Sequence, residues 1–145
     1  MNNSPEDKLT FLHLDFKADN MFFDWNDPEN PLIIFDWSLT FIGRGVFDLA
    51  VLLGWSLDTE IRRDIEKDVI KLYHESLLKQ NVKGYSFDEC WLDYLKGLLQ
   101  LSRFPISLFS RVDNNSSQRE VDLAKKVARR WFAAIIDNNA IKLMS

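Results

Sequence analysis

Apolar and polar residues are patterned in two different ways along this chain, and the pattern changes near residue 56. Before that point, short apolar runs alternate with polar turns, and the runs lie at residues 9–14, 21–23 and 32–35. Each run predicts a strand. The third is continuously apolar, which favours a strand buried on both faces. Dense turn chemistry over residues 24–31 predicts that the second and third strands form a hairpin. Residues 46–54 then predict a short apolar helix.

Beyond residue 56, apolar residues recur every three or four positions, as in amphipathic helices. The first predicted helix has an apolar stripe formed by Ile61, Ile65, Val69, Leu72, Tyr73 and Leu77. Asp58 or Thr59 can cap its start, and Gly84 lies just past its end. His74 lies in this helix without a partner at ligand spacing, so we expect it at the surface.

Two capping boxes predict two further helices, because the serine and the glutamate of each box satisfy free backbone N–H groups at a helix start. The box Ser86–Glu89 opens a helix that must end before Pro105. Its apolar face is formed by Trp91, Tyr94, Leu95, Leu98 and Leu99. The box Ser117–Glu120 opens a third helix, with a stripe formed by Val121, Ala124, Val127, Ala128, Trp131 and Ile135.

These elements predict an α+β fold that is mostly α. A small hairpin-bearing segment, residues 9–54, would pack on three long helices within residues 56–145. The length of 145 residues suits one domain over residues 1–145, with a core of its own.

Composition excludes several classes of protein. The 46% of hydrophobic residues is too high for a disordered chain, and a net charge of -4 argues against binding to nucleic acid or to an anionic membrane. The basic group at residues 125–130 therefore reads as the solvated face of a helix. A single cysteine, Cys90, excludes an internal disulfide framework. With no secretory signal and no apolar run of about 20 residues, we expect a soluble, cytoplasmic protein.

Three polar residues stand where strands and turns do not require them. Asp15 and Asn20 flank the loop between the first two strands, and Asp36 follows the third strand. The hairpin brings the chain back, so Asp36 can return beside Asn20. A carboxylate and an amide oxygen are hard ligands suited to Mg²⁺ that bridges phosphates. A second carboxylate nearby could accept a proton from a substrate hydroxyl. This set predicts phosphoryl transfer; the bland alternative is that these side chains cap turns.

The same residues resemble a known family. His13-Leu14-Asp15 followed by Asn20 is similar to the loop H-x-D-x-x-x-x-N of kinase-like phosphotransferases. The segments 33–37 and 45–50 resemble that family's metal-binding aspartate and the stretch after it. Together they resemble the aminoglycoside phosphotransferase and choline kinase-like superfamily, in its ecdysteroid-kinase-like branch. The resemblance extends over about residues 9–137 and implies the C-terminal lobe of a protein-kinase-like fold.

The resemblance also implies roles for particular side chains. Asp15 would be the catalytic base, and Lys17 would lie near the transferred phosphate. Asn20 and Asp36 would hold Mg²⁺ on the phosphates of ATP. The resemblance names no residue for the nucleotide base.

Two more residues would support the loop. His13 would brace it, and Asp48 would bond its backbone from a buried helix start. Leu14 departs from the family's usual His-Gly-Asp; a leucine costs backbone freedom there but is tolerated if its dihedral angles stay in an ordinary region.

What the resemblance implies is an ATP- and Mg²⁺-dependent kinase that phosphorylates a hydroxyl group of a small molecule. The chain lacks the glycine-rich loop and the nucleotide lobe of such enzymes. We therefore expect a truncated or split enzyme that is inactive alone, with the missing lobe on a further segment or a separate chain. The alternative is a non-catalytic binding or scaffold module derived from the lobe. An apolar patch near Phe16, Phe41 and Ile42 should mark where the missing lobe rests.

Overall fold

Three long helices dominate the computed structural model, which describes residues 8–144. They are α2 (Thr59–Lys79), α3 (Phe87–Gln100) and α5 (Gln118–Asp137). Two shorter helices are α1 (Val46–Val51) and α4 (Arg103–Ser110). The four strands are β1 (Thr10–Leu12), β2 (Met21–Phe23), β3 (Leu32–Ile34) and β4 (Phe41–Gly43). The predicted α+β fold, mostly α with three long helices, is confirmed.

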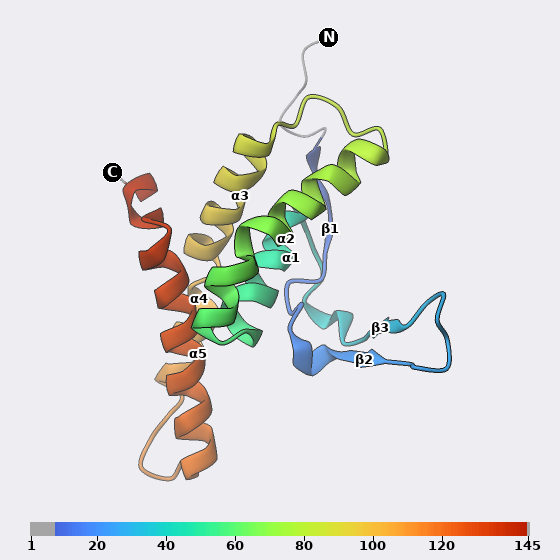
Figure 1. Cartoon of the computed structure of the whole chain (residues 1–145). Coiled ribbons are helices and arrows are strands. Elements are labelled where there is room, and N and C mark those ends of the chain that lie inside the picture. The colour runs from blue at the N-terminus through green and yellow to red at the C-terminus, as the bar shows by residue number, and fades with distance from the viewer. Residues whose placement is uncertain (1–7, 145) are drawn as a thin grey trace.

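The strands form two separate antiparallel pairs. β2 and β3 make the predicted hairpin, with Phe22 opposite Ile33. β1 pairs instead with β4, with Phe11 opposite Ile42. The strand β4 was not predicted, because its three residues run directly into the glycines that signal a break. Figure 1 shows the β2–β3 hairpin projecting away from the helices, while β1 runs alongside them.

The prediction that the third strand is buried on both faces is wrong. Leu32 and Ile33 are exposed, and so are Phe22 and Phe23 on the partner strand. The helices pack mainly on one another, and the projecting hairpin is not covered by them (Figure 1). A continuous apolar run therefore marks a strand that could be covered on both faces, and within residues 8–144 nothing covers it.

Residues of α1, α3 and α5 form much of the core. Val46 and Ala50 of α1 are fully buried, as are Tyr94 and Leu98 of α3. Trp131 of α5 is also fully buried, and its indole N–H donates to the Leu98 carbonyl oxygen at 2.8 Å. The hydrogen bond satisfies the one polar atom of the largest buried side chain, so the indole adds apolar area to the core without an unpaired donor.

Helix α2 buries only part of the predicted apolar stripe, because Val69, Tyr73 and Leu77 pack against the core and the other stripe residues do not. Its buried residues are Arg62, Glu66, Ile70 and His74. Ile61 and Leu72, from the predicted apolar stripe, are 52% and 61% exposed. The prediction that His74 lies at the surface is also wrong, because its Nε2 lies 2.8 Å from the Tyr85 carbonyl oxygen in the interior. The buried face of α2 therefore combines part of the predicted apolar stripe with polar side chains that find partners on neighbouring elements.

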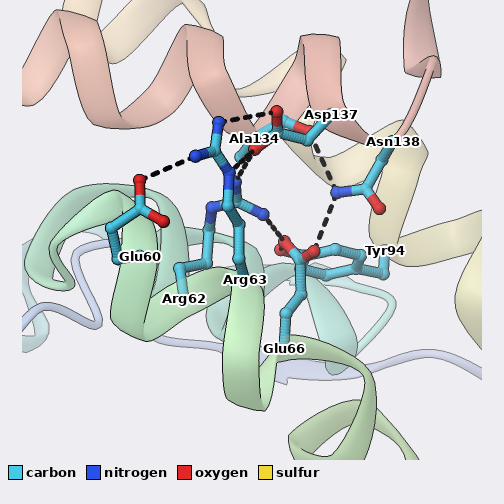
Figure 2. A network of polar contacts seen from close by, with 8 residues as sticks. All are labelled: Glu60, Arg62, Arg63, Glu66, Tyr94, Ala134, Asp137 and Asn138. Carbon is cyan, nitrogen blue, oxygen red and sulfur yellow. Dashed lines mark hydrogen bonds and ion pairs between the residues drawn. The ribbon is translucent and has the colours of Figure 1, made fainter.

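Those partners form the network drawn in Figure 2, in which Arg62 and Glu66 of α2 face residues of α3 and α5. Arg62 pairs with Asp137. Its Nη1 lies 2.8 Å from Glu66 Oε1, which is close enough for an ion pair but lacks hydrogen-bond alignment. Glu66 also accepts from the Tyr94 hydroxyl at 2.5 Å and from Asn138 Nδ2 at 2.8 Å. Buried charges need such partners, so the network holds the three long helices in one arrangement.

The two capping boxes are confirmed. The Ser86 hydroxyl accepts from the Glu89 backbone N–H, and the Ser117 hydroxyl accepts from that of Glu120. In each box the glutamate carboxylate accepts in turn from the backbone N–H of the serine. Helix α4 was not predicted; Pro105 lies in its first turn, where a missing N–H costs little. Among the helices of residues 8–144, none has both the length and the apolar character needed to cross a bilayer.

Candidate active site

The loop that joins β1 to β2, residues 13–20, brings three of the predicted site residues together; we refer to it as the Asp15 loop. Lys17 Nζ lies 2.7 Å from both carboxylate oxygens of Asp15. Asn20 Nδ2 donates to Asp15 Oδ2 at 2.7 Å and to its carbonyl oxygen at 2.9 Å. Both oxygens of the expected base are therefore engaged, and any proton acceptor role requires Lys17 to move.

Asp36 follows β3 and comes back toward Asn20, as the hairpin predicts. The Phe35 N–H donates to the Asn20 carbonyl oxygen at 3.2 Å, so Asp36 lies one residue beyond this pair. Its backbone is left-handed, with φ 62°, which aspartate tolerates better than most residues. The Ser38 hydroxyl donates to Asp36 Oδ1 at 2.7 Å and is the main reason that the carboxyl pKa is lowered, with smaller contributions from the Ser38 backbone N–H and the charge of Lys17. Asp36 is therefore an exposed, ionised carboxylate.

Asp48, in the first turn of α1, holds the backbone at the start of the Asp15 loop. Its two carboxylate oxygens accept the N–H groups of His13 and Leu14, each at 2.8 Å. Burial raises the pKa of Asp48 by more than these two hydrogen bonds lower it. The contact ties the loop to the helix that lies deepest in the core.

His13 links the Asp15 loop to the segment that carries Asp36. The ring is 1% exposed, and its Nε2 lies 2.9 Å from the Phe35 carbonyl oxygen. Because a carbonyl can only accept, the proton is on Nε2, and the buried Nδ1 has no hydrogen-bond partner among the described residues. The ring also packs on Trp37, with the centroids 4.7 Å apart. His13 thus occupies a structural position between the two halves of the site.

The comparison with known families bears on this stretch of chain. The sequence model of the Ecdysteroid kinase-like family matches residues 1–85, which include every predicted site residue. The chain belongs to the ecdysteroid kinase-like family. This family lies within the kinase-like phosphotransferase superfamily. No curated protein and no solved structure matches the chain.

One position of this ecdysteroid kinase-like chain departs from the family's usual sequence. Leu14 has φ 59°, so the condition under which a leucine is tolerated there without strain is not met. The left-handed conformation costs a leucine about 1–2 kcal/mol. Two contacts offset that cost: the Leu14 N–H is bound by Asp48, and the side chain is buried in the core. A buried leucine contributes about 1.5–3 kcal/mol, so the packing compensates for the strained backbone.

The oxygen donors near the Asp15 loop suit a substrate-bridged metal better than a permanent one. Within residues 8–144, no group of three or more histidine, cysteine, aspartate or glutamate side chains could hold a metal ion. The amide oxygen of Asn20 makes none of the contacts described above, and Asp36 is exposed. One or two such ligands, completed by water and phosphate oxygens, are what Mg²⁺ uses in phosphoryl transfer.

An open pocket of about 380 Å³ lies beside Asp15. Besides Asp15, Lys17 and Asp19, it is lined by Val51, Trp55, Phe104, Ser107, Leu108, Arg111 and Leu123. The apolar lining residues come from the end of α1 and the turn after it, from α4 and from α5. The charged lining residues are Asp15, Lys17, Asp19 and Arg111. The sequence did not predict that the lining residues from position 51 onward belong to the site. They lie up to about a hundred positions from Asp15, and no local pattern joins them to it.

Proposed function

We propose that this chain supplies the base and the metal ligands of a phosphotransferase that moves a phosphoryl group from ATP to a hydroxyl group of a small molecule. The observation that carries the proposal is the cluster of Asp15, Lys17 and Asn20, with Asp36 on the adjoining strand end. The family match covers all four residues. Positioning and charge neutralisation are the main requirements of this reaction, and the cluster offers both.

Each group has a distinct task in the proposed reaction. Asp15 orients the acceptor hydroxyl and takes its proton once Lys17 has moved from the carboxylate to a phosphate oxygen. Asn20, through its amide oxygen, and Asp36 would hold Mg²⁺, which would supply charge neutralisation for the phosphate oxygens. Asp48 and His13 keep the loop in place. The acceptor occupies the pocket beside Asp15.

We further propose that activity needs a second segment, on the same chain or another, that binds the nucleotide phosphates. The five glycines of the chain form no glycine-rich loop. Phe11 and Phe41, on the paired strands β1 and β4, are 73% and 65% exposed, and Ile42 is exposed beside them, whereas Phe16 is half-buried. Apolar surface of this kind is typical of a face that another segment covers.

The test is transfer activity in the presence of the nucleotide-binding segment of a family member, with Mg²⁺, ATP and a panel of small alcohols. Asp15→Asn should lower transfer by about 10²–10⁴-fold, the usual contribution of a positioned base. The matched control is Asp64→Asn, on the exposed side of α2, which should leave transfer unchanged. If Asp15→Asn retains full activity, Asp15 is not the base.

A second candidate is a non-catalytic scaffold, and the observation that favours it is the closed Asp15–Lys17 pair, in which both carboxylate oxygens are already engaged. Calorimetry separates the two functions. The phosphotransferase predicts heat on addition of Mg²⁺ and ATP to the chain with its nucleotide-binding segment, and loss of that heat in Asp36→Asn. A scaffold predicts no heat, and partner binding that is equal in the wild type and in Asp36→Asn.

A further inference from the structure

The turn that follows α1 reaches the Asp15 loop from 38 residues further along the chain. It is a π-helix, Leu52–Ser56, wider than an α-helix and a form found mostly as single turns near functional sites. We propose that Trp55 and Ser56 of this turn are positioning residues, which set the place of the Asp15 loop and of Lys17. The proposal rests on the function proposed above for Asp15 and Lys17, and it extends the site to two residues outside the loop.

Ser56 holds the second half of the loop. Its Oγ accepts the Ala18 N–H at 2.9 Å. Ala18 begins the short 3₁₀ turn that ends at Asn20, and within residues 8–144 no side chain of the loop itself caps that turn. Ser56 therefore supplies, from a distance, an acceptor for one of the free N–H groups at the start of this turn. It fixes the turn that directs Asn20 to Asp15.

Trp55 also contacts Lys17. The Lys17 ammonium lies 5.3 Å from the centroid of the indole ring, within the range of a cation–π contact. The ammonium therefore contacts both the Asp15 carboxylate and an aromatic face. Trp55 also lines the pocket beside Asp15. The indole thus helps to set the position from which Lys17 passes to an anion bound in that pocket.

Helix α5 supports the turn from behind. Arg130 Nη1 donates to the Trp55 carbonyl oxygen at 3.1 Å, and Arg130 Nε donates to Asp58 Oδ1 at 3.2 Å. Gly54 packs so closely on Trp131 that a β-carbon at position 54 would lie 3.1 Å from the indole. Helix α5, which is anchored in the core, thus holds the wide turn at Gly54 and Trp55.

Core packing alone does not account for these two side chains. Trp55 and Ser56 are half-buried, whereas their neighbours Leu53 and Gly54 are fully buried. A turn needed only for packing would use neither a hydroxyl aimed at Ala18 nor an indole face presented to Lys17. Both contacts are directed to the Asp15 loop.

The first experiment measures the two contacts by nuclear magnetic resonance on the full chain. Trp55→Leu should remove the ring-current shift of the Lys17 methylene protons, and Trp55→Phe should retain most of it. Ser56→Ala should speed hydrogen exchange of the Ala18 amide by roughly two- to tenfold, as loss of one ordinary hydrogen bond predicts. Ser56→Thr keeps the hydroxyl and should restore slow exchange. Thermal unfolding of each variant checks that the fold is intact.

Lys17→Met tests the same contact by changing the lysine and leaving Trp55 in place. Loss of the ammonium should shift the Trp55 indole resonance. The proposal is overturned if the Lys17 protons and the Ala18 amide are unaffected in folded Trp55→Leu and Ser56→Ala. Those two variants could fail to fold. In that case the proposal is overturned by two results together: Lys17→Met leaves the indole resonance unchanged, and the Ala18 amide does not exchange slowly in Ser56→Thr.

The second experiment measures transfer with the nucleotide-binding segment supplied. Trp55→Leu should lower kcat at least tenfold through a misplaced Lys17, and Trp55→Phe should recover most of the loss. Transfer unchanged in Trp55→Leu while the Lys17 protons move would show that the contact exists but positions nothing. Full activity in Asp15→Asn would instead remove the proposed function and leave the two contacts standing.

Discussion

The strand segment, residues 8–43, and the helical body, residues 46–144, differ in how deeply they bury their largest aromatic side chains. Trp131 and Tyr94 of the helical body are fully buried, whereas Phe11 of β1 and Trp25 of the hairpin turn are exposed. The body therefore contains a core of its own. The strand segment enters that core mainly through Leu12, beside the loop residue Leu14.

The difference shows how the candidate site is held. With little apolar packing behind it, the Asp15 loop depends on directed polar contacts that reach it from the body. Asp48 of α1 holds its first half, and Ser56 of the π-helix holds its second half. Apolar burial supplies the stability of the body, and a few hydrogen bonds supply the geometry of the site.

The largest expected effect tests this contrast with a matched pair of tryptophans. Trp131→Ala should lower the free energy of unfolding by about 3–5 kcal/mol, because it empties a fully buried site. Trp25→Ala should change it by about 0.5 kcal/mol or less, because the Trp25 side chain is 85% exposed. Urea denaturation of both variants measures the difference. Equal losses would show that the strand segment carries a core of its own.

A smaller effect is expected at Leu14, where the two regions join. Leu14→Gly relieves a left-handed backbone worth about 1–2 kcal/mol but removes a buried side chain worth about 1.5–3 kcal/mol. Glycine also adds about 0.5–1 kcal/mol of chain entropy to the unfolded state. We therefore expect a net loss of about 1–2 kcal/mol in the free energy of unfolding, measured in urea. A gain in stability would show that backbone strain outweighs packing at this junction.

The smallest effect concerns the ion pair between Lys8, before β1, and Glu89 of α3, at 3.1 Å. The Ser86 backbone N–H, with help from Lys8, lowers the pKa of Glu89 to about 2. Because the folded pKa lies below the unfolded value, the stability from this carboxylate is complete above pH 4.5 and is lost as the pH falls toward 2.

Glu89→Gln should flatten the pH dependence of unfolding between these two values, with a loss of a few tenths of a kcal/mol at pH 7 because the pair is solvent-screened. Glu120→Gln, in the capping box that lacks a lysine partner, is the control. If the two variants show the same pH profile, the ion pair of Lys8 with Glu89 contributes nothing to the free energy of unfolding.

Sequence alone determined the features that depend on neighbours along the chain. The hairpin follows from the turn residues 24–31, and the helices α3 and α5 follow from their capping boxes. The candidate site is equally local, since Asp15, Lys17 and Asn20 share one short loop. The hairpin register then brings Asp36 back beside it.

Only the tertiary structure decided which faces are buried and which distant groups meet. The apolar stripe of α2 predicted only part of its buried face, because Arg62 and Glu66 find partners on α5 and α3 that no helical periodicity can show. The pairing of β1 with β4, and the contacts of Trp55 and Ser56 with the Asp15 loop, join residues about 30–40 positions apart. Periodicity shows which residues of a helix or strand could be buried. Which of them are buried, and which strands pair, depends on the contacts between distant segments in the folded chain.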